Sequence, residues 1–129
     1  MIRIDIDDPE VEGDLAGRIT FRGEPFTGEA AEYHPNGQQI ALTTYVNGID
    51  DGPSREWYPD GSLRVEGATH SGYAVGEWRQ WFPDGRVLRM DVFDEEGNLQ
   101  TRRAWNEAGE IVEEYPAPRP DDGPGATPE

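Results

Sequence analysis

The residue types that carry out acid–base or metal chemistry occur in this sequence, but not at the spacings that such chemistry needs. His34 and His70 are the only histidines, and neither lies in an HxH or HExxH pattern that would bind zinc. Cysteine is absent, which excludes disulfides, thiolate metal ligands and cysteine nucleophiles. Aspartate and glutamate number 27, so two carboxylates at glycosidase spacing would arise from abundance alone. We therefore expect a protein that is not an enzyme and has neither cofactor nor metal site.

The acidic N-terminal segment has the composition of a calcium loop but not its spacing. An EF-hand loop beginning at Asp5 would need glycine at its sixth position and glutamate at its twelfth, where the chain has Glu10 and Ala16. The glycine pairs further along lack the lysine and helix of a phosphate-binding loop. We interpret residues 1–18 as a solvated acidic segment that contains an edge strand, because isoleucines alternate with charged residues at Ile2, Ile4 and Ile6.

A short phrase recurs along the chain with a period of 24 residues. Its clearest copy is Glu56-Trp57-Tyr58-Pro59-Asp60-Gly61, and its glycine recurs at Gly37, Gly85 and Gly109. The aromatic residue four places earlier keeps the same step, at Tyr33, Trp57, Trp81 and Trp105. A second glycine recurs at Gly28, Gly52 and Gly76, with Gln100 at the fourth position. A fixed period of this length is typical of a repeat architecture.

Each unit is predicted to contain two strands and two turns. Pro59, Asp60 and Gly61 suit a three-residue hairpin loop. That loop places Trp57 opposite Leu63, Glu56 opposite Arg64, and Arg55 opposite Val65. The same register in the other units pairs Tyr33 with Gln39, Trp81 with Val87 and Trp105 with Ile111. The second turn contains glycines four apart, such as Gly48 and Gly52, which we expect at the two ends of a hairpin connection.

The sequence therefore predicts an all-β protein made of four 24-residue β-hairpin repeats in an elongated, curved antiparallel sheet. The repeat domain is expected to cover residues 19–115, in units of 19–42, 43–66, 67–90 and 91–114. The fourth unit departs from the pattern, as terminal repeats that cap a stack often do. Residues 116–129 are rich in proline and glycine and are predicted to be a disordered tail.

The predicted register gives the sheet two different faces. One face carries the four aromatic residues, which we expect to hold neighbouring units together. The opposite face varies from unit to unit and could carry a function. It is predicted to hold His34, Tyr58, Phe82 and Asn106, and behind them Glu32, Glu56, Gln80 and Ala104. A structural alternative is that the N-terminal strand covers part of this face, at Trp78, Phe82, Leu88 and Met90.

The formal charge of −16 limits the partners of the chain. Such a charge repels nucleic acid and anionic membrane and attracts a basic partner, although solubility alone would also explain it. No apolar run is long enough for a membrane span, and the N-terminus lacks the features of a signal peptide. The expected location is the cytoplasm.

The unit Asn47-Gly48…Gly52…Glu56-Trp57-Tyr58-Pro59-Asp60-Gly61…Leu63 resembles the MORN-repeat variant of the YwqK-like antitoxin family. Gly23-Glu24-Pro25-Phe26-Thr27-Gly28 is similar to the first unit of that family. The resemblance covers residues 19–114 and implies a row of antiparallel hairpins without catalytic residues. It also implies an antitoxin or immunity protein that neutralises a partner toxin of a deaminase or nuclease class.

The function predicted from the sequence is therefore that of an immunity protein. It would bind a basic toxin domain that acts on DNA or RNA and occlude its active site. The free protein is expected to be a monomer, because the charged flanks at Asp5–Asp14 and at Glu113 and Glu114 should block the two open ends of the sheet. With the toxin it is expected to form a heterodimer. The alternative is a MORN-type scaffold or membrane-associated interaction module. The candidate toxin-binding residues are Glu32, His34, Asp50, Asp51, Glu56, Tyr58, Trp78 and Phe82, with Asp50 and Asp51 expected in a loop.

Overall fold

The computed structural model describes residues 1–117, which form twelve β-strands and no helix. The predicted tail therefore falls largely outside the described residues. The short N-terminal strands are β1 (Arg3–Asp5), β2 (Val11–Gly13), β3 (Ile19–Phe21) and β4 (Glu24–Pro25). The longer strands are β5 (Gly28–Tyr33), β6 (Gln39–Val46), β7 (Ile49–Trp57), β8 (Leu63–His70), β9 (Tyr73–Trp81), β10 (Val87–Phe93), β11 (Leu99–Trp105) and β12 (Ile111–Tyr115). Within residues 1–117, no helix is long and apolar enough to cross a membrane.

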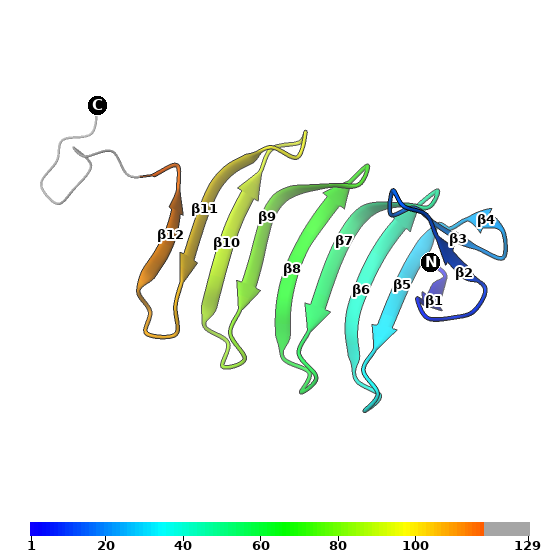
Figure 1. Cartoon of the computed structure of the whole chain (residues 1–129), viewed down its shortest axis with the longest axis horizontal. Coiled ribbons are helices and arrows are strands. Elements are labelled where there is room, and N and C mark those ends of the chain that lie inside the picture. Colours follow the sequence, from blue (N-terminus) through cyan, green and yellow to red (C-terminus); the bar gives the residue numbers. More distant parts are fainter. Residues whose placement is uncertain (118–129) are drawn as a thin grey trace, which may run out of the picture.

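Nine strands form one elongated, open sheet in the order β1-β5-β6-β7-β8-β9-β10-β11-β12 (Figure 1). From β5 to β12 each strand is antiparallel to the next, so the chain runs as four successive hairpins. Strand β1 adds to the edge of the sheet in parallel with β5. The predicted all-β array of four hairpins is confirmed, and β1 is a parallel addition to it.

The short turns that close the hairpins lie along one edge of the sheet, which we call the tight-turn edge. In the second hairpin Tyr58 N donates to Ser62 O at 2.8 Å and Gly61 N donates to Tyr58 O at 2.9 Å. The other three hairpins repeat these two bonds at His34, Phe82 and Asn106. Glycine is required at the end of each turn because Gly61 and its three equivalents adopt φ between +82° and +94°.

The predicted register is confirmed at the turns and wrong one residue further along the strands. Trp57 pairs with Leu63, and the corresponding aromatic residues pair with Gln39, Val87 and Ile111 as expected. A β-bulge then follows in every hairpin, so that Glu56 pairs with Val65 and Arg55 pairs with Glu66. The prediction assumed an uninterrupted ladder, whereas the bulge places two residues of one strand against one residue of the other.

The turns that connect one hairpin with the next lie along the opposite edge, which we call the second-turn edge. Two of these turns are shorter than the sequence suggested. Asn47-Gly48 and Ser71-Gly72 are two-residue turns with positive φ at both positions, which is the type I′ geometry preferred in hairpins. Gly52 lies inside β7, and so do Asp50 and Asp51. The expectation that these two aspartates lie in a loop was therefore wrong, because the turn uses only the first glycine of the pair.

Side-chain hydrogen bonds to backbone oxygens link neighbouring hairpins along the tight-turn edge. Asn36 Nδ2 donates to Pro59 O at 3.2 Å, Tyr58 Oη donates to Trp81 O at 2.6 Å, and Arg86 Nη1 donates to Glu107 O at 2.6 Å. No aromatic ring pair in residues 1–117 joins two of the four aromatic residues that recur at the 24-residue spacing. Backbone pairing and side-chain bonds such as these three, rather than ring-to-ring contact, therefore join the hairpins.

The apolar core lies at the β5 end of the array, under a small second sheet made of β2, β3 and β4. The core residues are Ile4, Ile19, Phe26, Ala30 and Tyr45, with Ile6, Val11 and Phe21 packed against them. The small sheet includes residues 19–25, which the 24-residue period had assigned to the first hairpin unit. The N-terminal segment thus covers Ala30 and Tyr45, and the alternative in which it covers Trp78, Phe82, Leu88 and Met90 was wrong.

Candidate functional site

The structure keeps part of the predicted assignment of residues to the two faces of the sheet. Glu32, Glu56 and Gln80 share a face, because Glu32 and Glu56 both pair with Ala41, and Glu56 and Gln80 both pair with Val65. We call this the variable face and the opposite one the ladder face. Met90 pairs with Arg79 and Arg103, each two residues before a ladder tryptophan. It therefore lies on the ladder face, because the bulge in β10 reverses the predicted alternation.

The two glutamates predicted on the variable face differ in how they are held. The Glu56 carboxylate forms an ion pair with Arg64, which is the extra residue of the β8 bulge. Glu32 is exposed and has no ion-pair partner among residues 1–117. Of these two residues, Glu32 is the one whose charge is available to a partner.

The aromatic residues predicted as binding anchors make structural contacts within the sheet. The Tyr58 hydroxyl donates to Trp81 O, as described above, and thus joins the second hairpin to the third. The Trp78 ring lies over Gly67, where a Cβ atom would meet the ring at 2.1 Å, and its Nε1 donates to Ala68 O at 3.0 Å. Both side chains are half-buried. Their positions are explained by packing between strands as well as by any role in binding.

His34 and Phe82 begin tight turns, as predicted from the repeated phrase. His34 Nδ1 accepts a hydrogen bond from Asn36 N at 3.1 Å. The Phe82 ring lies 5.5 Å from the Arg86 guanidinium carbon, and Arg86 also bonds Glu107 O of the next turn. These two residues therefore lie near Tyr58 along the tight-turn edge.

Asp50 and Asp51 lie at the other end of β7, away from the rest of the predicted set. Asp51 and Glu56 are five positions apart, which corresponds to about 17 Å along a strand. Asp50 pairs with Tyr45, and burial raises the pKa of its carboxyl. Asp51 Oδ1 lies 3.4 Å from His70 Nδ1. The structure thus separates Asp50 and Asp51 from the other six predicted residues instead of joining all eight in one site.

The second-turn edge carries three carboxylates that the sequence interpretation missed. Asp94, Glu95 and Glu96 occupy the turn between β10 and β11, where Asp94 N bonds Asn98 O and Gly97 N bonds Asp94 O. These are the two hydrogen bonds found in the tight turns. The turn between β10 and β11 therefore differs from the two-residue turns on the same edge. Three consecutive acidic residues before Gly97 were the available signal. Hydrogen bonds donated to the Asp94 carboxylate hold its pKa below the usual value, and the bond from the Asn98 backbone N–H contributes most.

We define the acidic edge as the five carboxylates Asp50, Asp51, Asp94, Glu95 and Glu96. None of them is bonded to an arginine within residues 1–117, and only His70 lies within ion-pair distance of one of them. By contrast, most carboxylates on the two faces, such as Glu56, Glu66 and Asp91, are paired with arginine. The acidic edge is therefore a strip of uncompensated negative charge.

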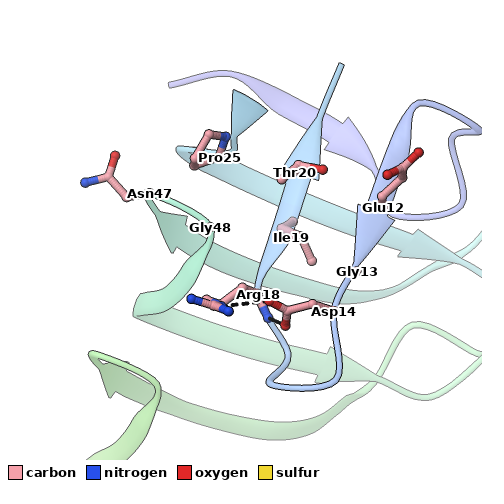
Figure 2. A pocket seen from close by; sticks show the side chains of 9 residues that line it. All are labelled: Glu12, Gly13, Asp14, Arg18, Ile19, Thr20, Pro25, Asn47 and Gly48. Carbon is pink, nitrogen blue, oxygen red and sulfur yellow. Dashed lines mark hydrogen bonds and ion pairs between the residues drawn. The ribbon is translucent and has the colours of Figure 1, made fainter. Parts of the chain in front are cut away.

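A hollow of about 360 Å³ lies between the small sheet and the turn that connects β6 with β7 (Figure 2). Its floor is fixed by the hydrogen bond from Ile19 N to Gly48 O at 2.9 Å. Two carboxylates, those of Glu12 and Asp14, line the hollow. The Asp14 carboxylate is neutralised by Arg18, whose Nε lies 2.7 Å from Asp14 Oδ2. None of the predicted binding residues lines this hollow.

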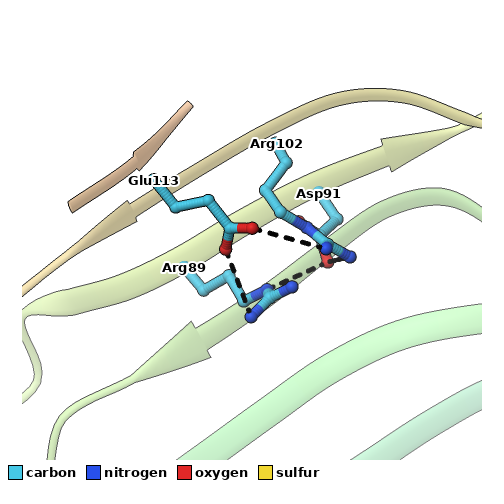
Figure 3. Close-up of polar contacts among 4 residues, drawn as sticks. All are labelled: Arg89, Asp91, Arg102 and Glu113. Carbon is cyan, nitrogen blue, oxygen red and sulfur yellow. Dashed lines mark hydrogen bonds and ion pairs between the residues drawn. The ribbon is translucent and has the colours of Figure 1, made fainter. Parts of the chain in front are cut away.

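A cluster of two arginines and two carboxylates ties the last hairpin to the third on the variable face (Figure 3). Asp91 is 7% exposed and receives hydrogen bonds from Arg102 Nε at 2.9 Å and from Arg89 Nε at 3.3 Å. Glu113 lies at 3.7 Å from Arg89 and 3.8 Å from Arg102. The hydrogen bond from Arg102 to Asp91 raises the pKa of the guanidinium further above its usual value. These contacts compensate the charges within the cluster.

Groups of three or more histidine, cysteine, aspartate or glutamate side chains placed to hold a metal ion are not found in residues 1–117.

Comparison with protein families matches residues 50–69 to the MORN repeat variant. The matched segment covers nearly all of β7 and β8, so the family unit corresponds to one hairpin with its tight turn in the middle. The predicted MORN-type repeat is thus confirmed for this hairpin. No match to a curated protein or to a solved structure was found.

Proposed function

We propose that this protein is an antitoxin, or immunity protein, that acts in the cytoplasm and neutralises a cognate toxin. The toxin would be a basic domain that acts on DNA or RNA, such as a deaminase or a nuclease. The antitoxin would bind it as a heterodimer and occlude its active site without any catalytic step of its own. The family match of residues 50–69 supports the coarser part of this proposal, a repeat module for interactions.

The acidic edge is the observation that supports a basic partner most directly. Five carboxylates that have no arginine partner within residues 1–117 line one edge of a protein whose formal charge is −16. A toxin that acts on nucleic acid carries a positive groove for phosphates, and a negative strip can both steer its approach and occupy those positions. Glu32 adds a carboxylate on the variable face that has no ion-pair partner in the described part of the chain.

The proposal predicts that a gene next to that of this chain encodes a basic toxin domain, and this domain is the partner to use in the test. We expect a one-to-one complex and loss of the toxin's activity on nucleic acid when the full chain is added. Neutralising the acidic edge with Asp51→Asn, Asp94→Asn, Glu95→Gln and Glu96→Gln should slow association and flatten its dependence on salt. Stopped-flow mixing at two or more ionic strengths measures both effects.

A matched control keeps the number of substitutions and moves them to paired carboxylates. Glu10→Gln, Asp14→Asn, Glu66→Gln and Glu77→Gln remove the same formal charge from residues that already bond arginine. We expect this variant to associate faster than the acidic-edge variant. Equal rates for the two variants would show that only net charge matters, and an active toxin in the presence of excess antitoxin would refute the proposal.

The family match also supports a second candidate, a MORN-type scaffold or membrane-associated interaction module. The charge of −16 opposes binding to anionic lipid, where each basic residue near the surface contributes about 1 kcal/mol. Co-sedimentation with anionic vesicles at physiological salt separates the two candidates. Clear vesicle binding would favour the scaffold, and its absence together with toxin inhibition would favour the antitoxin.

A further inference from the structure

Strand β12 forms an open edge of the large sheet. Among residues 1–117, β11 is the only strand that pairs with it, so the outer side of β12 presents unpaired backbone groups. Its apolar side chains are also uncovered, since Ile111 is 51% exposed, Val112 is 61% exposed and Tyr115 is 51% exposed. At the other edge, β1 has only three residues. The sequence interpretation expected Glu113 and Glu114 to block this edge, but both carboxylates bond arginines of the inner strands instead.

The three junctions between hairpins show what such an edge accepts. Each junction pairs the second strand of one hairpin with the first strand of the next. An arginine lies in the same register position each time, where Leu42 pairs with Arg55, Glu66 pairs with Arg79, and Met90 pairs with Arg103. The arginine always precedes a ladder tryptophan by two residues. On β12 the corresponding position is Glu114, which is 48 residues after Glu66.

Glu66 and Glu114 both bond an arginine of the strand before them, and they differ in what lies on their outer side. Glu66 pairs with Arg55 on one side, where Arg55 Nε and Glu66 Oε2 are 2.9 Å apart. On the other side its backbone pairs with Arg79, whose Nη2 bonds Glu77 Oε2 at 2.9 Å. Glu114 pairs with Arg103 on its inner side, where Arg103 Nη2 and Glu114 Oε2 are also 2.9 Å apart. No residue of the described chain lies opposite Glu114 on its outer side. The position that Arg79 fills beside Glu66 is thus open beside Glu114.

We propose that the outer edge of β12 binds an antiparallel β-strand of the partner, with arginine or lysine opposite Glu114 and an aromatic residue two positions later. This inference rests on the proposed function, because it takes the partner to be the basic toxin domain. Backbone hydrogen bonds provide affinity in this mode of recognition and the alternating side chains provide specificity. The added strand would continue the register that the chain itself uses three times.

A second copy of this chain fits the edge less well than a basic partner does. The exposed edge strand β12 contains no arginine that would lie opposite Glu114 of another copy. The other edge strand, β1, contains Arg3, but this residue already bonds Glu29 at 3.1 Å. Carboxylates also gather around β12 and its turn, at Glu107, Glu110, Glu113 and Glu114. Charge complementarity therefore favours a basic strand.

The inference is tested with a synthetic peptide that copies residues 73–81, the strand that pairs beside Glu66. We expect the peptide to bind the full chain and to slow amide hydrogen exchange in β12, while exchange in the internal strand β6 stays unchanged. A peptide with Arg79→Glu should bind up to about fivefold more weakly, as expected for the loss of one cross-strand pair. A copy with N-methylated backbone amides should not bind, because it cannot form the ladder.

A charge swap shows whether Glu114 is the residue that recognises the charge at position 79 of the peptide. The Glu114→Arg chain should prefer the Arg79→Glu peptide over the unchanged one, reversing the order found for the natural chain. This comparison holds even if the substitution loosens β12, because both peptides meet the same variant. Binding without protection of β12, or an unchanged order of preference, would overturn the inference. Self-association with β12 protected in the absence of peptide would assign the edge to a second copy instead.

Failure of this inference can be told apart from failure of the proposed function. If the toxin is inhibited while exchange in β12 is unchanged in the complex, the strand site is wrong and the antitoxin role stands. If the peptide binds β12 with the expected preference but the toxin remains active, the strand site stands and the antitoxin role is wrong.

Discussion

At the β5 end of the array a second sheet packs on the first, and at the β12 end nothing in the described chain does. The β5 end buries Ile4, Ile19 and Phe26 between the two sheets, each less than 9% exposed. The β12 end instead holds its last strand through the charged cluster around Asp91 and leaves Ile111 and Val112 exposed. One end of the same repeat array is thus stabilised by apolar burial and the other by ion pairs. Apolar burial provides most of the free energy of folding, so the β5 end should be the more stable one.

The comparison is tested most strongly by removing the most buried aromatic side chain of the core at the β5 end. Phe26 is 4% exposed, and its ring packs near Phe21 and Tyr45. We expect Phe26→Ala to lower the free energy of unfolding by about 3–5 kcal/mol. Val112→Ala at the β12 end is the matched control and should cost less than about 0.5 kcal/mol. Urea unfolding monitored by tryptophan fluorescence measures both, and equal losses would show that the two ends do not differ.

The charged cluster provides the corresponding test at the β12 end. Asp91→Asn leaves Arg89 and Arg102 without their shared buried carboxylate, so we expect a loss of about 2–3 kcal/mol. The loss should appear first as faster amide exchange in β11 and β12, with β5 protected as before. Asp84→Asn, which removes an exposed carboxylate bonded to Arg86, is the control and should cost far less. Unchanged exchange in β12 would show that the cluster does not hold this end.

Substitutions at Gly67 and Trp78 test how tightly the side chains in the middle of the array are packed. A Cβ atom at Gly67 would lie 2.1 Å from the Trp78 ring, so Gly67→Ala should displace the ring at a cost of about 1–3 kcal/mol. The same substitution in a Trp78→Ala background should cost much less, because the clash is then absent. A double-mutant cycle measured in urea gives the coupling. Additive effects would mean that the ring does not depend on the glycine.

The smallest expected effects concern two aspartates of the acidic edge, one near each end. Burial raises the pKa of Asp50, so its ionised form lowers stability above that pKa, and the effect disappears below the unfolded value of 3.8. Asp50→Asn should therefore stabilise the protein at pH 7 by well under about 1 kcal/mol, because the carboxyl remains in contact with solvent. This gain should vanish as the pH falls below 3.8.

Asp94 should behave in the opposite way. Hydrogen bonds lower its pKa, so its ionised form adds stability above the unfolded value of 3.8 and the contribution is lost as the pH falls through the folded pKa. Asp94→Asn should therefore destabilise the protein at pH 7 and have no effect in strong acid. Thermal unfolding across the pH range measures both variants. The same sign for the two would show that packing at the β5 end does not desolvate Asp50.

Much of the fold could be predicted from the sequence because the repeat is encoded locally. Proline and glycine at fixed positions determine the tight turn, and the turn determines that Trp57 lies opposite Leu63. The bulge that follows could not be predicted, because it depends on the fit between neighbouring strands rather than on a residue type. The error moved Met90 to the wrong face and placed Arg55 opposite the wrong residue.

The candidate site was less predictable than the fold, since it depends on which side chains remain unpaired. Glu32 and Glu56 occupy equivalent positions in the repeat, yet the Glu56 carboxylate is paired with Arg64 and Glu32 is not paired. Tyr58 was selected as an anchor because it is aromatic, whereas its hydroxyl joins two hairpins. The first unit's departure from the array, where residues 19–25 enter the small sheet, depends on long-range packing around Phe26. A period read from the sequence contains no information about it.

The uniform register between hairpins has a consequence for how such proteins change length over evolution. Deleting residues 49–72 would join Gly48 directly to Tyr73, and the strand that then follows β6 would place Arg79 opposite Leu42, where Arg55 lies now. A duplication of the same segment would insert a hairpin with equal ease, and each inserted hairpin would lengthen the sheet by about 9.6 Å. Loss or gain of one genetic segment can therefore resize the molecule while both of its ends keep their neighbours.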